Sequence, residues 1–332
     1  MKPPYLELVC PAGTPAALRA AIDAGADTVY CGFRDATNAR NYPGLNFDVE
    51  EMAEGAAYAH ERGRKLLVAI NTFPLAGEPE PWHAAIDNAA AIGADAVIMA
   101  DIGLLDYATR KHQNLRRHLS VQAAASNPLS IAFYRDNFDI KRVVLPRVLS
   151  VEEVAAIIGE IRIETEVFCF GSVGTMSEGR CFLSSYMTGL SPSHAGACAP
   201  ASHVAYKEEE GGCRLACLGD VTLNRFGKDE AASYPTPCKG RYVALGQPSY
   251  LFEEPVGWNV IDILPQLKAA GVTALKIEGR QRSRAYVTQV VSSFRHVLDA
   301  LAAGETDIDT GALHQLAEGG QQTLGAYQKG WR

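Results

Sequence analysis

The sequence predicts an α/β protein built as a (β/α)8 TIM-like barrel, with a long cysteine-rich insertion after the seventh strand. One observation is a repeated phrase, in which a glycine ends a helical pattern and a short β-branched run follows: DAGADTVYCG, AIGADAVIMAD and, more loosely, AAGVTALKIEG. Glycine suits the left-handed residue after a helix, and such apolar runs are typical of strands buried on both faces. The other observations are that helical patterns alternate with these runs and that there are eight runs, which favours a closed parallel barrel.

The elements follow in order along the chain. Strands are expected at 5–10, 27–33, 65–71, 96–100, 118–123, 142–147, 164–171 and 273–279. Helices are expected at 14–24, 48–62, 80–92, 102–112, 128–137, 150–161, 261–270 and 283–303. Asn127-Pro128 and Ser150 have the residue types of helix starts. An open doubly wound sheet is the alternative, but no GxGxxG motif follows the first strand, so dinucleotide binding lacks its usual signal.

Three regions divide the predicted fold. Residues 1–171 hold the first seven strand–helix units, 172–258 form the insertion, and 259–332 complete the barrel and add a C-terminal tail. A loop of this length in a compact domain is usually functional or a small subdomain. Because it follows a strand, it should emerge at the carboxyl-end face, where barrel enzymes keep their active sites.

Composition and charge narrow the class of protein. The chain has 332 residues and a net charge of −7, which disfavours a broad nucleic-acid-binding surface. The N-terminal residues do not resemble a secretory signal, and no run reaches the roughly 18 to 20 apolar residues of a membrane span. We therefore expect a cytoplasmic protein, whose eight cysteines are not structural disulfides.

Six of the eight cysteines lie at or within the predicted insertion: Cys169, Cys181, Cys198, Cys213, Cys217 and Cys238. The other two, Cys10 and Cys31, end apolar strands and are expected to be buried packing residues. The CRLAC sequence is the nearest approach to a zinc-type spacing, whereas an iron–sulfur cluster tolerates wide spacing. The residues alone leave an iron–sulfur cluster, zinc and no metal all open.

Polar residues at the predicted strand ends indicate an anion site at the barrel mouth. Arginine can make bidentate contacts to an anionic small molecule. The candidate substrate-binding residues are Arg40, Asn71, Gln122, Arg147, Arg180, Arg241 and Arg280. The alternative is that these arginines pair with carboxylates of the protein. Glu178 and Glu278 are the candidates for proton transfer, and the HExxH and GxSxG motifs of peptidases and hydrolases are absent from the sequence.

Long stretches of the chain resemble one known family. They include TNARNYPGLNF at 37–47, VQAAASN at 121–127, MSEGRCFLSSYMTGLSP at 176–192, YPTPCKGRY at 234–242 and KIEGRQRS at 276–283. The chain is similar to the collagenase-like peptidases of peptidase family U32 and, within that family, to its UbiU-like ubiquinone-biosynthesis members. The resemblance runs nearly end to end.

The resemblance implies a 4Fe–4S cluster on four cysteines. Three of them correspond to Cys181, Cys198 and Cys238, and the fourth position is occupied here by Gly174. Cys169 is the tentative fourth ligand. Cys213 or Cys217 could replace it, or the cluster could have three thiolates and one open iron.

The resemblance also implies an activity. We expect the iron–sulfur subunit of an oxygen-independent hydroxylase that acts anaerobically on ubiquinone precursors, as a heterodimer with a UbiV-like homologue and with prephenate as oxygen donor. Peptidase activity is not expected. The alternatives are an RNA-base hydroxylase of the same family, which the acidic charge balance disfavours, and a non-catalytic partner subunit stabilised by zinc.

Overall fold

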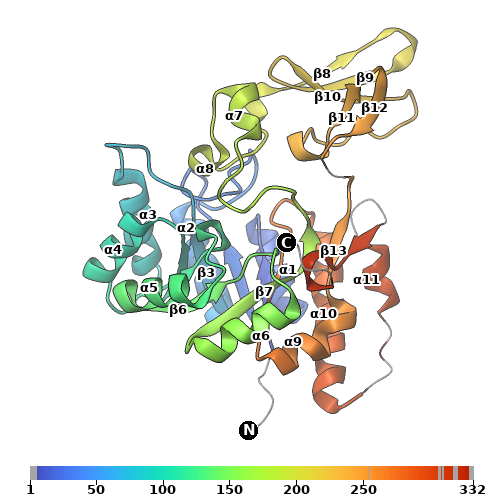
Figure 1. Cartoon of the computed structure of the whole chain (residues 1–332). Helices are drawn as coiled ribbons and strands as arrows, with labels where there is room; N and C mark the ends of the chain where they lie inside the picture. Colours follow the sequence, from blue (N-terminus) through green and yellow to red (C-terminus); the bar gives the residue numbers. More distant parts are fainter. Residues whose placement is uncertain (1–5, 253, 306–307, 309, 317–320, 329–332) are drawn as a thin grey trace.

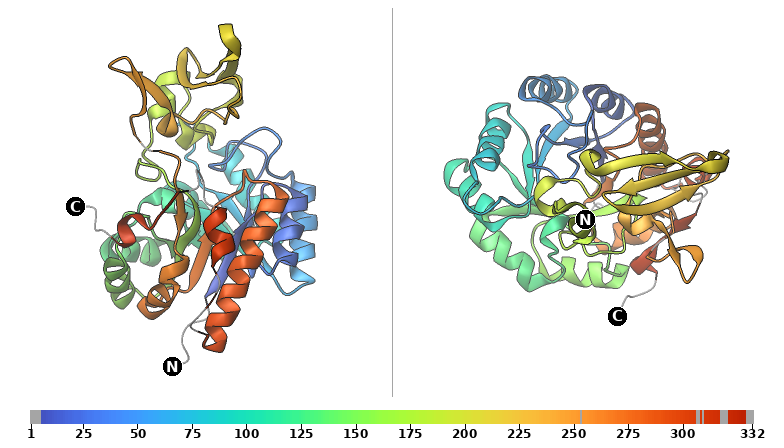
Figure 2. Two further views of the ribbon diagram at one scale, coloured as in Figure 1. Left: turned by 90° about the vertical axis from the view of Figure 1, so that its right-hand side faces the viewer. Right: turned by 90° about the horizontal axis from the view of Figure 1, so that it is seen from above.

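The core of the molecule is a closed barrel of eight parallel strands, which confirms the predicted fold class. The computed structural model describes residues 6–252, 254–305, 308, 310–316 and 321–328. The last barrel strand, β14, pairs with both β1 and β7 and so closes the ring (Figure 2). The strands are β1 Glu7–Pro11, β2 Thr28–Cys31, β3 Lys65–Ile70, β4 Ala96–Met99, β5 Arg117–Leu119, β6 Ile140–Val144, β7 Glu164–Ser172 and β14 Ala274–Ile277.

Helices surround this ring in the predicted order. They are α1 Pro15–Asp23, α2 Val49–His60, α3 Glu80–Ala91, α4 Ile102–Lys111, α5 Pro128–Phe138, α6 Val151–Glu160, α9 Leu264–Ala270 and α10 Arg284–Ala303, with α11 Gly311–Gln315 following. Both predicted helix starts are confirmed, because the side chains of Asn127 and Ser150 accept the backbone N–H groups of Ser130 and Glu153. Within the described residues, no helix combines the length and apolar character needed to cross a membrane.

One predicted strand is too long. The run expected at 118–123 ends at Leu119, and Val121–Ala123 forms a 3-10 turn. The hydroxyl of Ser120 accepts the N–H of Gln122, and Ala124 is left-handed with a φ of 52°. A side chain that satisfies the backbone locally competes with the sheet, so the strand stops early.

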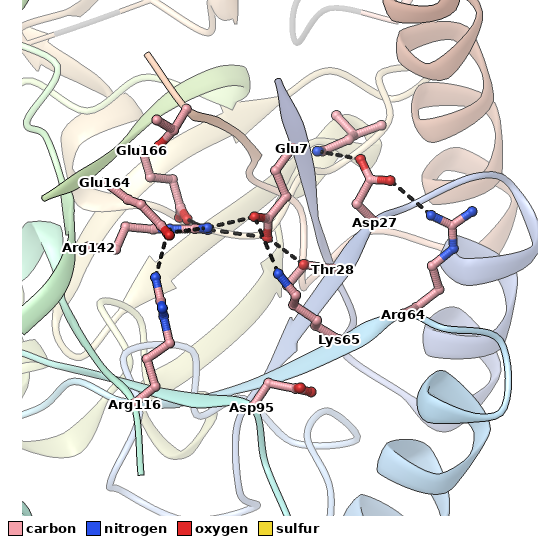
Figure 3. A network of polar contacts seen from close by, with 12 residues as sticks. Glu7, Asp27, Thr28, Arg64, Lys65, Asp95, Arg116, Arg142, Glu164 and Glu166 are labelled. Atoms are coloured by element: carbon pink, nitrogen blue, oxygen red, sulfur yellow. Dashed lines mark hydrogen bonds and ion pairs between the residues drawn. The ribbon is translucent and has the colours of Figure 1, made fainter. Parts of the chain in front are cut away.

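The amino-terminal half of the barrel interior is charged. Arg142 bonds to Glu7 at 2.6 Å and to Glu166 at 3.0 Å (Figure 3). Lys276 bonds to the other oxygen of Glu166 at 2.6 Å. Arg142, Glu166 and Lys276 are all buried. Burial alone lowers the pKa of Lys276, whereas the nearby Glu166 opposes that change. Buried charges of this kind persist because each has a hydrogen-bonded partner of opposite sign.

Between β7 and the return to the barrel, the chain builds an arm above the carboxyl ends of the strands (Figure 1). The arm contains α7 Leu183–Thr188, α8 Pro192–Ala195, an antiparallel sheet of β8 Val204–Glu208, β9 Arg214–Leu218 and β10 Val221–Phe226, and a hairpin of β11 Arg241–Ala244 and β12 Gln247–Tyr250. Strand β13, Gly257–Asn259, then pairs with β7 and with β15, Gln322–Thr323. The division of the chain at 171 and 258 into separate units stays a prediction.

Candidate active site at the barrel mouth

Glu278 lies at the centre of the barrel mouth, directly after β14. One carboxylate oxygen pairs with Arg40, from the loop after β2, and the other pairs with Arg147, from the end of β6, at 3.1 Å. The side chain is only 15 % exposed. Burial alone would raise the pKa of Glu278, but the two guanidinium groups lower it to about 2. Glu278 is therefore a fixed anion, and a group with so low a pKa is poorly matched to proton transfer near neutral pH.

Arg147 connects this carboxylate to a second one. Its Nη1 lies 3.1 Å from Glu178, and its guanidinium stacks over the ring of Phe168, with 3.6 Å between the guanidinium carbon and the ring centroid. The Nε of Arg147 is buried and has no hydrogen-bond partner among the described residues. The planar group is thus held by a ring and two carboxylates in one orientation.

Three other predicted residues brace the loops of the mouth. Arg280 is buried and donates to Asn38 at 3.0 Å, and burial lowers its pKa to about 10. Asn71 accepts the N–H of Ala39 at 3.0 Å and donates to Ser120 at 3.3 Å. The backbone carbonyl of Gln122 lies against Gly179, where a Cβ would come within 2.2 Å of it.

The last two predicted arginines lie apart from Glu278. Arg180 is exposed and bonds to the carbonyl of Gly179. Arg241 belongs to β11 of the arm, where it pairs with Glu230 at 2.8 Å and donates to the carbonyl of Arg225 at 2.9 Å. The structure does not bring Arg241 to the mouth with the others, because its guanidinium is used to join strands of the arm.

A small apolar core gathers the segments that carry three of the predicted metal ligands. Its buried residues are Ala199, Leu218 and Leu223, and Met187 and Tyr242 pack against it. Cys198 directly precedes the first of these residues, and Cys181 comes two residues before α7, which contains Met187. Cys238 lies in the 3-10 turn Pro237–Lys239, which is in contact with α7.

Cys181 and Cys198 lie close enough to interact electrostatically. Burial raises the pKa of Cys181, and the neighbouring Cys198 raises it further. Cys181, Cys198 and Cys238 are each partly exposed. In the part of the chain that the structure describes, no group of three or more His, Cys, Asp or Glu side chains is arranged to hold a metal ion. Thiolates are the donors that an iron–sulfur cluster takes, and such a cluster on Cys181, Cys198 and Cys238 stays a prediction.

The fourth position predicted for such a cluster is open. Gly174 is exposed, and a Cβ built there would meet nothing within 4 Å. Cys169 is fully buried in the main core with Cys10 and Cys31, and burial raises its pKa well above the usual value. The sulfur of Cys169 therefore belongs to the packing between the strands and the helices, and the number of thiolate ligands stays a prediction.

The CRLAC pair does not form a zinc site. Both cysteines lie beside or in β9, an extended strand, so the four residues from Cys213 to Cys217 span about 14 Å. Cys217 is buried with its sulfur 3.6 Å from the hydroxyl of Thr222. The span of about 14 Å between Cys213 and Cys217 is too large for two ligands of one zinc ion.

The cysteine-bearing arm is in contact with the barrel mouth. Lys239, next to Cys238, donates to the hydroxyl of Ser172 at 2.8 Å, and its charge also favours ionised Glu278. Burial opposes the charge on Arg40, but Glu278, followed by Tyr42 and Cys198, outweighs burial and raises its pKa. Neither Tyr42 nor Lys239 was singled out from the sequence, although both lie in stretches that carry the family resemblance.

A separate hollow lies on the flank of the barrel between α3 and α4. Its volume is about 540 Å³, and its lining residues are His83, Gly103, Asp106, Tyr107, Arg110 and Lys111. Arg110 pairs with Asp106 at 3.0 Å, and Lys111 pairs with Asp87 at 2.7 Å. Because the described cations of this hollow are already paired, we do not include it in the candidate site.

The fold and the site define a (β/α)8 barrel protein with a charged mouth covered by a thiol-bearing arm. More particularly, the chain belongs to peptidase family U32, whose model matches residues 13–329.

Three curated proteins are similar in sequence to this chain. An uncharacterized protease of Methanocaldococcus jannaschii is 30% identical over 90% of this chain and 66% of its own length. tRNA hydroxylation protein P1 of Bacillus subtilis is 31% identical over 90% of this chain and 64% of its own length. tRNA hydroxylation protein P of Escherichia coli is 30% identical over 93% of this chain and 71% of its own length. The chain thus spans just under two thirds of the first two relatives. The UbiU-like part of the resemblance stays a prediction.

Proposed function

We propose that this chain is the iron–sulfur subunit of an oxygen-independent hydroxylase that acts on the aromatic ring of a ubiquinone precursor. One observation carries the proposal: the arginine-rich barrel mouth is linked to the cysteine-bearing arm, because Arg40 interacts electrostatically with Cys198 and Lys239 of the arm bonds to Ser172. The family assignment and the relatives named as hydroxylation proteins support a hydroxylase-type role. Peptidase activity has little support, because the mouth holds paired charges rather than a nucleophile beside a base.

The charges of the mouth suit an anionic oxygen donor. Among the described residues, Arg40, Arg147 and Arg280 lie at the mouth with two carboxylates, those of Glu178 and Glu278, so the charge of this group is positive. A dicarboxylate such as prephenate would be attracted to this surplus and oriented by the fixed guanidinium of Arg147. In the overall exchange, the ring C–H becomes C–OH and loses two electrons, and the donor's hydroxyl is replaced by hydrogen.

The cluster would be held by Cys181, Cys198 and Cys238. When bound, it supplies one-electron transfer without dioxygen. For proton transfer we retain Glu178 rather than Glu278. Glu178 pairs with one guanidinium, whereas Glu278 pairs with two and has a pKa of about 2.

A UbiV-like homologous subunit is the proposed partner. The hairpin of β11 and β12 carries exposed apolar residues at Val243 and Leu245, and Leu251 and Phe252 follow directly after it. Apolar side chains that cluster on an exposed surface often mark a protein–protein contact. This surface supports the proposed heterodimer.

Hydroxylation of an RNA base is the second candidate. The named tRNA hydroxylation relatives, at 31% and 30% identity, favour it. The net charge of −7 counts against broad RNA contact by this chain alone. The third reading, a non-catalytic subunit stabilised by zinc, predicts stoichiometric zinc in place of iron.

One experiment separates these functions. The protein is purified and reconstituted with iron and sulfide under nitrogen, alone and with its UbiV-like homologue, and its iron and zinc contents are measured. It is then incubated with prephenate and either an unhydroxylated ubiquinone precursor or hydroxylation-deficient tRNA, and products are identified by mass spectrometry. A hydroxylated ring supports the first proposal, and a hydroxylated nucleoside supports the second. Zinc without iron supports the third and overturns both hydroxylase proposals. Cys198→Ala should lose iron, and Cys213→Ala is the matched control.

A further inference from the structure

We propose that Tyr42 is a positioning residue for the cysteine site, whose hydroxyl donates a hydrogen bond to the sulfur of Cys198. The tyrosine oxygen lies 3.0 Å from that sulfur. The proposal deepens the proposed function and rests on it for the cluster. A thiolate bound to metal has no proton to give, so in the loaded protein the tyrosine must be the donor.

The loop that carries Tyr42 is clamped onto the segment just before Cys198. The backbone N–H of Asn41 bonds to the carbonyl of Gly196 at 3.1 Å, and its side chain bonds to the carbonyl of Ala195 at 3.3 Å. Gly196 has a φ of 76°, and a Cβ there would lie 2.2 Å from the carbonyl oxygen of Asn38. Only glycine permits so close an approach in this conformation, so the loop and the segment are held in a defined relation.

A second tyrosine, Tyr234, packs against the ring of Tyr42. Tyr234 packs edge-on against it, with 6.0 Å between ring centroids and an interplanar angle of 86°. The hydroxyl of Tyr234 donates to the carbonyl of Ala199 at 2.8 Å, directly beside Cys198. The two rings therefore bracket the same cysteine, but only Tyr42 contacts its sulfur through an oxygen.

The position of Tyr42 also relates the sulfur to the barrel mouth. Arg40, two residues earlier, pairs with Glu278 and lies within electrostatic range of both Tyr42 and Cys198. The Tyr42 hydroxyl therefore joins the sulfur of Cys198 to the loop that carries Arg40. Hydrogen bonds to ligand sulfurs are one of the means by which proteins set the reduction potential of iron–sulfur clusters.

A pair of matched variants separates this role from simple packing. Tyr42→Phe keeps the ring and removes only the hydroxyl on Cys198. Tyr234→Phe removes a neighbouring hydroxyl that bonds to a backbone carbonyl. If Tyr42 only fills space, both variants should leave the chemistry of the sulfur unchanged.

The first measurement needs no metal. Iodoacetamide labelling of each cysteine in metal-free protein is followed by peptide mass spectrometry. Loss of the one hydrogen bond between the hydroxyl and the sulfur should slow labelling of Cys198 about fivefold in Tyr42→Phe, with Cys181 and Cys238 unchanged. Tyr234→Phe should label like the wild type. Equal rates in all three proteins, or faster labelling of Cys198 in Tyr42→Phe, would overturn the proposal.

The second measurement uses the reconstituted protein. Tyr42→Phe should lower the reduced fraction of the cluster at a fixed potential about tenfold, equivalent to about 59 mV for a one-electron couple. If the wild type holds iron and Tyr42→Phe has the same reduction potential, the role proposed for Tyr42 is contradicted, but the proposed function is not. A wild type that holds no iron overturns the proposed function instead, and the labelling result then decides the Tyr42–Cys198 contact separately.

Discussion

Replacing Glu278 with glutamine should destabilise the folded protein by an amount that depends on pH. The amide keeps the shape of the side chain but removes the charge that pairs with Arg40 and Arg147. The pKa of Glu278 is lowered from 4.5 to about 2. Since one pKa unit corresponds to about 1.4 kcal/mol, the ionised carboxylate contributes on the order of 3 kcal/mol at pH 7.

The sign of the pH dependence follows from the direction of the shift. A carboxyl group whose folded pKa is depressed stabilises the protein above its unfolded pKa, and this stabilisation is lost as the pH falls through the folded value. The contribution of Glu278 should therefore be on the order of 3 kcal/mol at pH 7 and about 1.4 kcal/mol at pH 3. The difference in unfolding free energy between wild type and Glu278→Gln should shrink accordingly.

Urea unfolding followed by circular dichroism at pH 7, 5, 4 and 3 measures this difference. Glu160→Gln is the matched control, because Glu160 is exposed at the end of α6 and should show little difference at any pH. A difference below about 1 kcal/mol at pH 7 would refute the assigned charge pairing, since single exposed pairs contribute no more than that. A difference that stays constant from pH 7 to pH 3 would refute the lowered pKa.

Three further predictions concern the metal site and the barrel interior. Gly174→Cys should slow the loss of iron from the reconstituted protein in air, because a side chain fits there; loss as fast as in the wild type contradicts this. Cys169→Ala should keep the wild-type iron content, because the sulfur of Cys169 lies in the main core, whereas Cys198→Ala should lose iron. Iron loss in Cys169→Ala would show instead that Cys169 is a ligand. Arg142→Met should lower the unfolding free energy by about 3 to 5 kcal/mol in urea titrations, because buried Glu166 loses one of its cations; a change below about 1 kcal/mol would count against the network.

The barrel could be predicted from sequence because its signals are local. A glycine that ends a helix, a short β-branched run and a capping side chain each lie within a few residues of the element they define. The strands of the arm lack such a signal. Val204–Glu208 is almost entirely exposed, so it shows no alternation of buried and exposed residues, and its pairing with β9 could not be read from the sequence.

The contacts within the candidate site could not be predicted, for a related reason. Arg147 and Glu278 were proposed from their positions at strand ends and Arg40 from its residue type, but their pairing joins residues more than one hundred positions apart. The place of Arg241 in the arm could not be predicted, because nothing local distinguishes an arginine at the mouth from one that joins strands of the arm. Cys169 lies in the apolar stretch EVFCF, and its burial in the main core agrees with that context.

The ion pairs inside the barrel limit how molecules can travel. Arg142, Glu166 and Lys276 are buried and paired with one another in the amino-terminal half of the barrel, so we expect a molecule that binds near Glu278 to enter and leave at the carboxyl-end face. With a single entrance, the product must dissociate before the next substrate molecule can bind. The turnover rate would then depend on how fast substrate and product pass the arm as well as on the rate of the chemical step.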